Sequence, residues 1–517
     1  MAQFSLPDTS FLSDPASGST VLQRGIEKES LRITPQGHLS DSPHPAALGS
    51  PLAHPSITTD FSEAQLELIT AVHQTPEAAL QQLRDVHKFV YQGIGDELLW
   101  PGSMPCLVGN DDEIPVGSYG TSHIGMAKTI YRRGLGVRYG RLMQTISGIH
   151  YNFSVPPAMW QALGVDSQEQ ITDRYFGLIR NFRRWSWLLL YLFGASPTVC
   201  KSFTRSLEHQ LDSFDEGSHY LPLATSLRMG PLGYQSSAQK SLGISYNCLD
   251  EYADTMHQAL VTPYPPYESI GTQRDGEYIQ LNTSIIQIEN EFYGAIRPKR
   301  PVRSGERPLQ ALRSRGVEYV EVRCLDLNPM LDVGIDEAQV RFLDTFLLVC
   351  LLTESPPDTP AEIEALQANQ LAIVERGRDP QLELTATGHG PDAPVNARQW
   401  ARELLKACAQ VATHLDTAHG NNDHTTATQA QLAKVDDDAL TPSATILRHM
   451  GEQEIPFFRF SMNLAQEHGE YFRSNKLSDT QTTAFQESVT ESFAQQKAIE
   501  DASTEPFEVF LENYLAL

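Results

Sequence analysis

The chain contains little cysteine, and its cysteines form no recognisable motif. Its 517 residues include six cysteines, which are scattered without a Cys-x-x-Cys pair. The sequence therefore does not support a zinc ribbon or a dithiol redox motif. A low cysteine density in a long chain is typical of a reducing compartment, so we expect six mostly buried thiols.

Positive charge and long apolar runs are also scarce. The chain has 39 basic and 64 acidic residues, a net charge of −25. Non-specific nucleic-acid binding and docking on anionic membranes both need a basic surface, so neither is expected. The most apolar run, Trp185 to Ala195, is shorter than the roughly 20 residues that span a bilayer. The N-terminus lacks the pattern of a signal peptide, and we expect a cytoplasmic location.

Several familiar catalytic motifs are missing as well. The sequence has no Gly-x-x-x-x-Gly-Lys-Ser/Thr loop, no Gly-x-Gly-x-x-Gly after a strand, and no Gly-x-Ser-x-Gly. These absences argue against a P-loop protein, a Rossmann protein and an α/β-hydrolase. A nucleotide, if one is bound, must be held by metal ions on a sheet.

Three short stretches alternate like β-strands but place charged groups on a face that a strand normally buries. These groups are Glu27 and Glu29 in the first stretch, His150 in the second, and Glu321 and Arg323 in the third. Carboxylates on one inward face repel each other and lose hydration, which is costly unless positive charge lies between them. The cation that best suits clustered oxygens is a divalent metal such as Mg²⁺. The pattern predicts a metal site on the floor of a sheet, with an arginine beside it.

Simpler interpretations exist for each part of this pattern. A pair such as Glu27 and Glu29, taken alone, is more often a solvated edge strand. A single histidine such as His150 is more often a hydrogen-bonded core residue than a ligand. However, the segment after residue 57 adds Asp60 and Glu67 around a predicted turn and strand. The coincidence of three acidic groups favours the metal site.

Basic residues elsewhere offer contacts for carboxylates or phosphates. Arg228 follows Ala-Thr-Ser-Leu, and Arg297 and Lys299 lie in Ile-Arg-Pro-Lys-Arg. Planar arginine suits bidentate contacts with such anions, although surface ion pairing is an equal alternative for Lys299. The Gly-rich stretch 117–140 has the composition of a mobile loop that closes over substrates.

The chain divides by pattern into two regions. Residues 1–20 are rich in Ser, Pro and Asp and are expected to be loose. Residues 21–335 mix strands and helices, and residues 336–517 are mainly helical and pack on the first region. The alternatives are one integrated domain and a separate interaction domain at 336–517. Helices are predicted at 76–100, 185–195, 252–261 and 336–352, a linker at 355–360, and a strand at 278–285 after an Asp275-Gly276 turn.

The motifs resemble those of the glutamate–cysteine ligases of the proteobacterial type. The matching stretches include Arg24-Gly-Ile-Glu-Lys-Glu-Ser-Leu-Arg, Thr58-Thr-Asp-Phe-Ser-Glu-Ala, Gln144-Thr-Ile-Ser-Gly-Ile-His-Tyr-Asn-Phe-Ser, Ala224-Thr-Ser-Leu-Arg, Gln287-Ile-Glu-Asn-Glu-Phe-Tyr and Gly316-Val-Glu-Tyr-Val-Glu-Val-Arg-Cys-Leu-Asp-Leu-Asn-Pro. They run from about residue 21 to 329 and recur in Thr504-Glu-Pro-Phe. After about residue 355 the likeness thins.

The resemblance implies a fold, a reaction and a set of ligands. The fold is α+β and glutamine-synthetase-like, with a curved, mainly antiparallel sheet that forms a funnel and has helices outside. The reaction joins the L-glutamate γ-carboxylate to the L-cysteine amine through a γ-glutamyl phosphate, with ATP as co-substrate. It is the first step of glutathione biosynthesis. The family also implies two or three Mg²⁺ ions, which Mn²⁺ can replace, a monomer, and feedback inhibition by glutathione.

The resemblance further implies roles for individual residues, carried over by matching motif. The metal-site residues are Glu27, Glu29, Asp60, Glu67, His150 and Glu321. Arg323 faces the transferred phosphate, with Arg297 and Lys299 as further nucleotide contacts, and Glu321 and Arg323 are the expected catalytic pair. Arg228 binds glutamate. The cysteine pocket consists of Phe61, Tyr131, Arg132, Leu135, Gln144, Tyr234 and Tyr293.

Two other functions remain open at this point. The first is a carboxylate–amine ligase of the same fold that uses a different amine. The second, from another class, is a non-catalytic acidic protein that binds metal and regulates a partner. A complete acidic set with Arg323 beside it favours an enzyme, and a cysteine-sized pocket lined by Tyr234 and Tyr293 would separate the two ligases.

Overall fold

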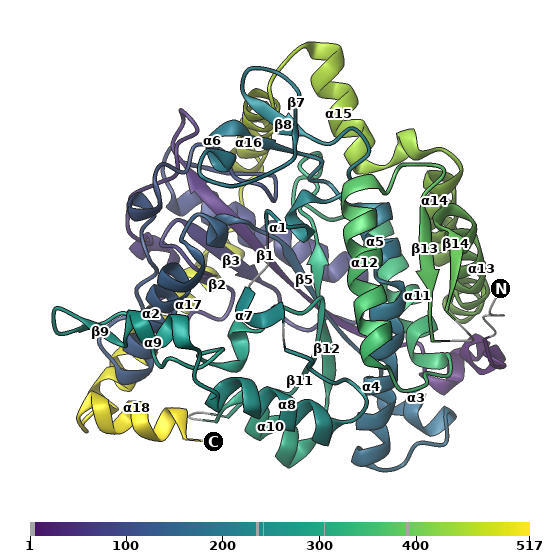
Figure 1. Ribbon diagram of the computed structural model, residues 1–517, viewed down its shortest axis with the longest axis horizontal. Helices are drawn as coiled ribbons and strands as arrows, with labels where there is room; N and C mark the ends of the chain where they lie inside the picture. The colour runs from purple at the N-terminus through teal and green to yellow at the C-terminus, as the bar shows by residue number, and fades with distance from the viewer. Residues whose placement is uncertain (1–5, 234–236, 241, 304–305, 389–391, 517) are drawn as a thin grey trace.

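A seven-stranded antiparallel sheet forms the centre of the computed structural model (Figure 1), which describes residues 6–516 except 234–236, 241, 304–305 and 389–391. The strand order is β11-β12-β5-β1-β3-β2, and β4 pairs with β1 beside this path. The bounds are β1 Gln23–Ile33, β2 Ile57–Thr59, β3 Gln65–Ile69, β4 Leu98–Leu99, β5 Ile149–Ser154, β11 Ile296–Lys299 and β12 Tyr319–Leu325.

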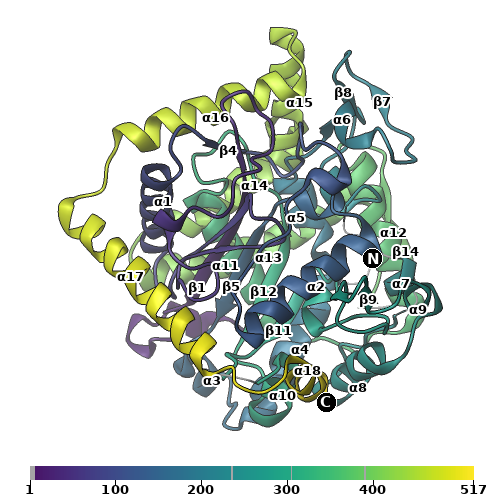
Figure 2. The same ribbon diagram turned by 90° about the vertical axis from the view of Figure 1, so that its left-hand side faces the viewer.

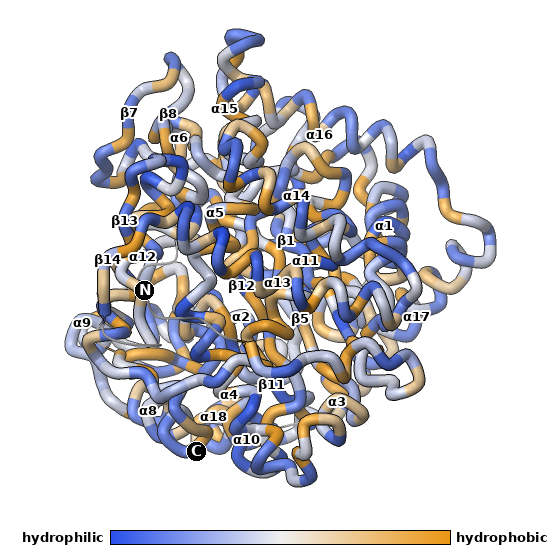
Figure 3. The backbone as a smooth tube through the Cα atoms, turned by 90° about the vertical axis from the view of Figure 1, so that its right-hand side faces the viewer, coloured by the Kyte–Doolittle hydropathy of each residue, from blue (hydrophilic) through white to orange (hydrophobic). Residues whose placement is uncertain are grey.

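The two faces of this sheet differ in chemistry because side chains alternate along each strand. On the back face, Ile26, Tyr151 and Val322 are buried at 1% exposure or less. The front face carries the carboxylates discussed below. Apolar segments gather around the sheet in the middle of the molecule, whereas the outer helix α17 is mostly polar (Figure 3).

Helices α1 (Pro76–Gly93) and α11 (Glu337–Leu352) cover the back face. α1 begins at Pro76, and the Thr75 side chain caps its first turn. From α11, Asp344 Oδ2 accepts a hydrogen bond from Arg24 Nε at 3.1 Å, and its Oδ1 accepts one from Tyr151 Oη at 2.6 Å. The buried carboxylate of Asp344 is thus paired, and it ties α11 to two neighbouring strands.

Helix α2 (His123–Tyr139) lies on the front of the sheet. The chain returns to it at the end through α16 (Phe457–Ser474), α17 (Asp479–Ala502) and α18 (Phe507–Leu515), which follow one another along the outside of the molecule (Figure 2). Leu511 of α18 packs in a small cluster with Ala127 and Ile130 of α2. The C-terminal helix therefore braces α2.

The other elements surround this frame. One hydrophobic core contains residues from Leu12 to Leu477, so residues before and after 335 share it. No helix among the described residues is long and apolar enough to cross a membrane. The remaining helices are α3 Pro157–Ala162, α4 Gln168–Trp185, α5 Trp187–Phe193, α6 Lys201–Thr204, α7 Ser237–Lys240, α8 Leu249–Val261, α9 Pro265–Ile270, α10 Pro308–Arg315, α12 Pro360–Arg376, α13 Ala397–His419, α14 Asp423–Asp436 and α15 Pro442–Gln453; the remaining strands are β6 Thr198–Cys200, β7 Asp212–Ser213, β8 Ser218–Tyr220, β9 Gln273–Arg274, β10 Glu277–Tyr278, β13 Glu383–Ala386 and β14 Ala393–Asn396.

The four predicted helices are confirmed. α1, α5, α8 and α11 lie within the predicted ranges or begin within three residues of them, and α12 begins at Pro360, directly after the predicted linker. Asp336 is the N-cap of α11, because its side chain accepts a hydrogen bond from the amide of Gln339.

The prediction of a mobile loop at 117–140 is wrong, because most of this stretch is helix α2. Ser122 caps the helix by accepting from the amide of Gly125. The glycines allow close packing: a Cβ on Gly134 would lie 2.1 Å from Oε1 of Gln287. Glycine content indicated flexibility, but here it permits a helix to approach its neighbour.

The strand predicted at 278–285 is also wrong, although the Asp275-Gly276 turn is confirmed between β9 and β10. Beyond Tyr278 the backbone is irregular, and side chains replace a strand ladder. The Gln280 amide donates to the carbonyls of Tyr267 and Gly271, and Gln287 accepts from the amide of Leu281. Side-chain hydrogen bonds to the backbone therefore take the place of strand pairing in this segment, despite its alternating sequence.

Two further expectations fail. The described part of the N-terminal segment is not loose: it forms two short 3₁₀ turns, Leu12 is fully buried, and Ser13 hydrogen-bonds His414 at 2.7 Å. The expectation of six thiols fails because Cys106 and Cys200 form a disulfide. The other four cysteines are free, and three of them are buried as expected.

Candidate active site

The front face of the sheet collects the predicted carboxylates through strand register. Glu29 of β1 lies opposite Glu67 of β3, and Glu27 lies opposite His150 of β5. On the far side of β5, Asn152 lies opposite Glu321 of β12. Directly opposed residues share a face, so antiparallel pairing alone assembles this carboxylate floor.

His150 lies at the centre of the carboxylate floor. Its Nδ1 is 3.2 Å from Glu27 Oε2 and 3.7 Å from Glu321 Oε1, and its Nε2 is 3.4 Å from Glu29 Oε1. Its side chain is only 6% exposed. The histidine therefore touches carboxylates from both neighbouring strands, which sequence alternation did not indicate.

The negative charge of the carboxylate floor around Glu29 and Glu67 exceeds the positive charge of the neighbouring side chains. Burial, followed by the charge of Asp60, raises the pKa of Glu29 to about 7. Burial and the charge of Glu27 likewise raise the pKa of Glu67 well above its usual value. Both shifts disfavour the charged carboxylates, which an added positive charge would stabilise.

This donor set fits a divalent cation. One ligand atom each from Glu27, Glu67 and His150 lie within 4.8 Å of one another. Carboxylate oxygens suit Mg²⁺ and Mn²⁺, and one imidazole nitrogen is acceptable to Mn²⁺ in particular. A cation there would replace the protons that burial now favours on Glu29 and Glu67.

Glu321 differs because basic groups surround it. Lys299 Nζ is 3.3 Å from its Oε1, and Arg323 donates to its Oε2 at 3.4 Å. Burial would raise the pKa of Glu321, but the charges of Lys299 and Arg323 outweigh it and hold this pKa well below the usual value. Glu321 is thus ionised, and it holds both cations at the β11–β12 edge of the floor.

Arg297, also predicted to contact the nucleotide, has a different neighbourhood. It lies opposite Glu321 in the β11–β12 pair but donates to the backbone carbonyls of Asn290 and Phe292. It does not line the cleft described next. Its contacts anchor the 290–292 segment, and its role in nucleotide binding stays a prediction.

A cleft of about 290 Å³ lies above the carboxylate floor. Its wall opposite the β11–β12 edge comes from α2 and the turn after β2. Tyr234 lies outside the described residues, but the other residues predicted for the cysteine pocket all line the cleft: Phe61, Tyr131, Arg132, Leu135, Gln144 and Tyr293. We call Phe61, Tyr131, Leu135, Gln144 and Tyr293 the amine pocket.

The guanidinium of Arg132 donates hydrogen bonds to backbone carbonyls. Its Nε donates to the carbonyl of Asp60, Nη2 to that of Thr59 at 3.3 Å, and Nη1 to that of Lys128 at 3.1 Å. Its guanidinium also stacks on the Tyr119 ring, 4.4 Å from the centroid. Arg132 therefore holds the turn that carries Asp60.

Arg228 borders a second, smaller pocket of about 90 Å³ that it shares with His150, Tyr293 and Arg323. Its Nη2 donates to the carbonyl of Arg323 at 3.1 Å, and its Nη1 lies 3.8 Å from Asp326 Oδ1. Asp326 also accepts from Ser196 and Ser226, so the buried carboxylate fixes the turn that carries Arg228.

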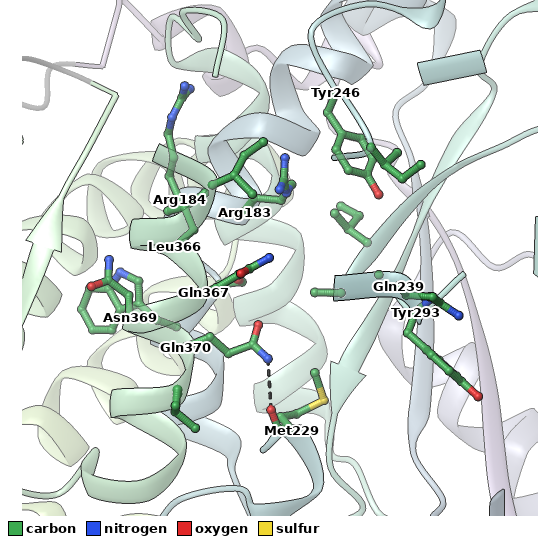
Figure 4. Close-up of a pocket in the computed structure, with 18 of the residues that line it drawn as sticks. Arg183, Arg184, Met229, Gln239, Tyr246, Tyr293, Leu366, Gln367, Asn369 and Gln370 are labelled. Carbon is green, nitrogen blue, oxygen red and sulfur yellow. Dashed lines mark hydrogen bonds between the residues drawn. The ribbon is translucent and has the colours of Figure 1, made fainter. Parts of the chain in front are cut away.

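A third pocket, of about 370 Å³, adjoins the second, and residues that line it are drawn in Figure 4. The two share Met229, Tyr293 and Gln370 as lining residues. Gln370 of α12 donates to the carbonyl of Met229 at 3.0 Å, and Tyr293 lies on the opposite side. This pocket extends from the neighbourhood of Arg228 between α12 and the 292–296 segment.

Sequence reasoning missed the residues that place Tyr293. Glu291 is fully buried and accepts from Arg138 at 2.8 Å and from the Tyr139 hydroxyl at 2.6 Å. Two residues earlier, Glu289 pairs with Arg307 at 2.6 Å. The motif at 287–293 contains both glutamates, and its unusual density of acidic residues beside apolar ones was the available signal. Both glutamates anchor the segment to other elements and neither lines the cleft.

The fold and the site together define a class: an α+β protein with a candidate cation- and anion-binding site on the inner face of an antiparallel sheet. Comparison with known proteins narrows this class. The sequence pattern of the glutamate–cysteine ligase family matches residues 12–373. A glutamate–cysteine ligase of Pseudomonas putida is 50% identical over 498 residues, which are 95% of this chain and 94% of the relative. One from Alcanivorax borkumensis is 48% identical over 513 residues, 97% of each chain.

Solved structures agree with these sequence relatives. The crystal structure of a glutamate–cysteine ligase from Francisella tularensis in complex with AMP matches with a TM-score of 0.89 and 36% identity, over 96% of this chain and 97% of that one. A bifunctional glutathione synthetase from Pasteurella multocida shares the fold, with a TM-score of 0.69 and 23% identity over 90% of this chain and 54% of that one. The chain belongs to the glutamate–cysteine ligase family, as its motifs predicted.

Proposed function

We propose that this chain joins the γ-carboxylate of L-glutamate to the amino group of L-cysteine, with hydrolysis of ATP to ADP and phosphate. Family membership across nearly the whole chain supports this reaction. The structural observation that carries it is a buried floor of carboxylates with basic groups on both flanks. Such a floor suits a charged co-substrate held through cations.

The chemistry explains why such a floor is needed. A carboxylate does not acylate an amine at neutral pH, because its leaving group is too poor. Transfer of the γ-phosphoryl group of ATP to the glutamate carboxylate gives an acyl phosphate and ADP. The amine of cysteine then attacks the acyl carbon, the C–O bond to phosphate breaks, and inorganic phosphate leaves. Phosphoryl transfer depends on positioning and on charge neutralisation.

We propose Glu27, Glu29, Asp60, Glu67, His150 and Glu321 as the residues that hold two or three Mg²⁺ or Mn²⁺ ions. Asp60 lines the cleft beside Glu67. The raised pKa values of Glu29 and Glu67 support a requirement for added positive charge. When bound, the ions neutralise the triphosphate and orient it.

We assign the phosphate contacts to Arg323 and Lys299, which flank Glu321 at one edge of the floor. Arg323 stabilises the negative charge on the phosphoryl group during its transfer. This contact lowers the activation barrier of phosphoryl transfer more than it strengthens nucleotide binding. Arg228 takes a carboxylate of glutamate in the smaller pocket, where Asp326 fixes its position.

The amine pocket then receives cysteine. Gln144 donates to the Tyr293 hydroxyl at 3.3 Å, and Phe61 and Leu135 pack together beside them. A rigid pocket with apolar ring faces suits a small polarisable thiol. The same pockets would accept the γ-glutamylcysteine part of glutathione, which supports feedback inhibition. A monomeric state and a cytoplasmic location also remain our proposals.

An ADP-release assay with glutamate, cysteine and ATP tests the function. We expect ADP release to need all three, with γ-glutamylcysteine as the product identified by mass. L-2-aminobutyrate should be a poorer amine, because its methyl group replaces the thiol at a cost of about 1–3 kcal/mol. Ammonia should be poorer still, because it gains nothing from the pocket.

The alternative function, a ligase that uses a different amine, predicts a different order of preference among the amine substrates. If ammonia matches cysteine in kcat/KM, the chain is a glutamine-forming ligase and the assignment to cysteine fails. If no amine supports ADP release while metal still binds, the chain is a non-catalytic metal-binding protein.

A further inference from the structure

One acidic residue of the Thr58-Thr-Asp-Phe-Ser-Glu-Ala motif has been given no role so far. Glu63 comes three residues after Asp60 and two after Phe61, and these two side chains line the cleft. Glu63 itself is half-buried and is not among the described residues that line the cleft. Its carboxylate therefore acts on the surrounding chain and not on a ligand in the cleft.

The turn that carries Asp60 and Phe61 receives little support from the sheet. It follows β2, which has three residues, comes last in the strand order and pairs with β3. Such an edge strand is hydrogen-bonded to the sheet on one side, and its other side is left for contacts from elsewhere. The position of the turn thus depends on segments outside the sheet.

Residues 115–119, which we call the bracing segment, lie against this turn. The amide of Gly117 donates to the carbonyl of Phe61 at 2.9 Å. Two residues further on, the Tyr119 hydroxyl donates to the carbonyl of Asp60 at 3.2 Å. Both residues of the turn that line the cleft are therefore held through their own carbonyls, and the bracing segment sets where they lie.

Glu63 joins the bracing segment to the turn. Its Oε1 accepts from the amide of Ser118 and its Oε2 from the amide of His44, both at 2.5 Å. Its own amide donates to the carbonyl of Pro115 at 3.2 Å, and its carbonyl accepts from the buried Arg32 at 3.1 Å. Hydrogen bonds to an ionised carboxylate are stronger than neutral ones, so Glu63 is a strong link between these parts of the chain.

We propose that Glu63 is a positioning residue that fixes the turn of Asp60 and Phe61, and through this turn the cation site and the amine pocket together. The assignment rests on the proposed function, because it presupposes a cation at Asp60 and an amine substrate beside Phe61. A shift of the turn moves both side chains at once. Arg228 is unaffected, because no described residue of the turn lines its pocket. Glu63 thus couples metal affinity to amine binding and leaves glutamate binding unchanged.

The test is E63Q, measured by Mn²⁺ binding and by steady-state kinetics with each substrate varied in turn. Glutamine offers one oxygen, and its NH₂ group faces the second amide as another donor, so one contact breaks. We expect Mn²⁺ binding without substrates, measured by isothermal titration calorimetry, to weaken by about tenfold, and KM for cysteine to rise by about tenfold. KM for glutamate should stay within about twofold of the wild type. Excess Mg²⁺ should recover part of the lost kcat, because mass action refills a weakened metal site.

Two further variants complete the test. E113Q is the matched control, because Glu113 is exposed and accepts from the amide of Asn110 at 2.7 Å in the preceding loop, so it should resemble the wild type. Y119F removes only the hydroxyl that reaches the turn, so it should show the pattern of E63Q to a smaller extent, and it decides the matter if E63Q does not fold.

Three results would overturn the proposal: unchanged Mn²⁺ affinity in E63Q and Y119F, equal rises in KM for cysteine and glutamate, or the same losses in E113Q. A wild type inactive with cysteine would refute the proposed function itself. An active wild type with any of those three results refutes only the role of Glu63.

Discussion

At the residue scale, charge balance decides what each side chain on the floor can do. Glu321 is ionised because two basic residues flank it, whereas burial favours protons on Glu29 and Glu67. The first carboxylate holds Lys299 and Arg323 in place. On the other two, a bound cation would replace the protons that burial favours.

The first prediction concerns the metal. E321Q removes the charge of one proposed metal ligand and releases Lys299 and Arg323, so turnover should fall by at least about a hundredfold. Mn²⁺ binding, followed by isothermal titration calorimetry, should weaken in the same variant. E318Q is the matched control, because Glu318 is on the same segment but 53% exposed, and within the described part of the chain its ion pair is with Arg300. Full activity of the wild type in excess EDTA would disprove the metal assignment.

The second prediction concerns Arg323. R323K keeps the charge but loses the planar fork, so under the proposed contact with phosphate oxygens it is not conservative. We expect kcat to fall far more than ATP affinity, since the contact strengthens as the phosphoryl group moves. If ATP affinity collapses while kcat at saturation is unchanged, Arg323 binds only the ground state.

The third prediction is a pH dependence of stability from His54. Its Nδ1 accepts from the amides of Ser56 and Ile57, and burial lowers its pKa to about 4 from the usual 6.5. The unfolded chain takes up this proton below about pH 6.5 and the folded chain does not, so stability falls as the pH drops from there toward 4.

H54N supplies an oxygen acceptor for the same two amides without a titrating ring. Relative to this variant, the wild type should lose about 2 kcal/mol of unfolding free energy between about pH 7 and pH 5. Urea unfolding of both proteins at the two pH values measures the difference. An identical difference between the two proteins at both pH values would show that His54 is not the titrating group.

Most of the site was predictable at this scale, for a physical reason. Alternation along a strand fixes which side chains share a face, so Glu27 with Glu29 and Glu321 with Arg323 could be paired from sequence. The contacts of His150 with three carboxylates depend on strand order, which alternation does not encode. The engagement of Arg132 by backbone carbonyls likewise depends on how α2 meets the turn after β2.

At the scale of elements, α2 and α18 form one wall of the cleft. Leu511 packs against α2, and Tyr514 lines the cleft directly. The carbonyl of Tyr514 accepts from Arg307, whose guanidinium pairs with Glu289. The C-terminal helix is therefore connected both to the amine pocket and to the segment that carries Tyr293.

The fourth prediction follows from this wall. A chain that stops after Ser503 lacks α18, so α2 loses its outer support and Tyr131 becomes exposed. We expect KM for cysteine to rise by about tenfold or more, because small misplacements of binding groups are costly. KM for ATP should change little. The control is F493A on α17, whose ring is 42% exposed. Equal effects on all substrates would indicate general destabilisation instead.

Helices with strong apolar periodicity were predictable, and elements built on polar contacts were not. α11 has a capping aspartate and a long apolar stretch, and both signals are local. α2 was missed because its glycines indicated a loop, although they serve close packing against Gln287. The irregular segment after β10 was missed because Gln280 and Gln287 satisfy backbone groups that a strand ladder would have paired.

At the scale of the whole molecule, the order of the sheet separates the charges. Acidic groups lie at its centre, while basic groups lie on the β11–β12 edge and on the wall above β2. Asp344 ties the back of β1 and β5 to α11, so the floor is supported by a helix from the C-terminal half. Under the proposed assignment, a nucleotide and an amine would approach the same carboxylate from different sides.

The central claim is that the chain phosphorylates the glutamate carboxylate before the amine attacks it. Glutamate labelled with ¹⁸O in both γ-carboxylate oxygens tests this claim directly. One labelled oxygen bonds to the γ-phosphorus of ATP and leaves with it when the amine attacks the acyl carbon. We predict one ¹⁸O atom in each inorganic phosphate released, measured by mass spectrometry, and one in the peptide product. Unlabelled phosphate formed together with γ-glutamylcysteine would contradict the account.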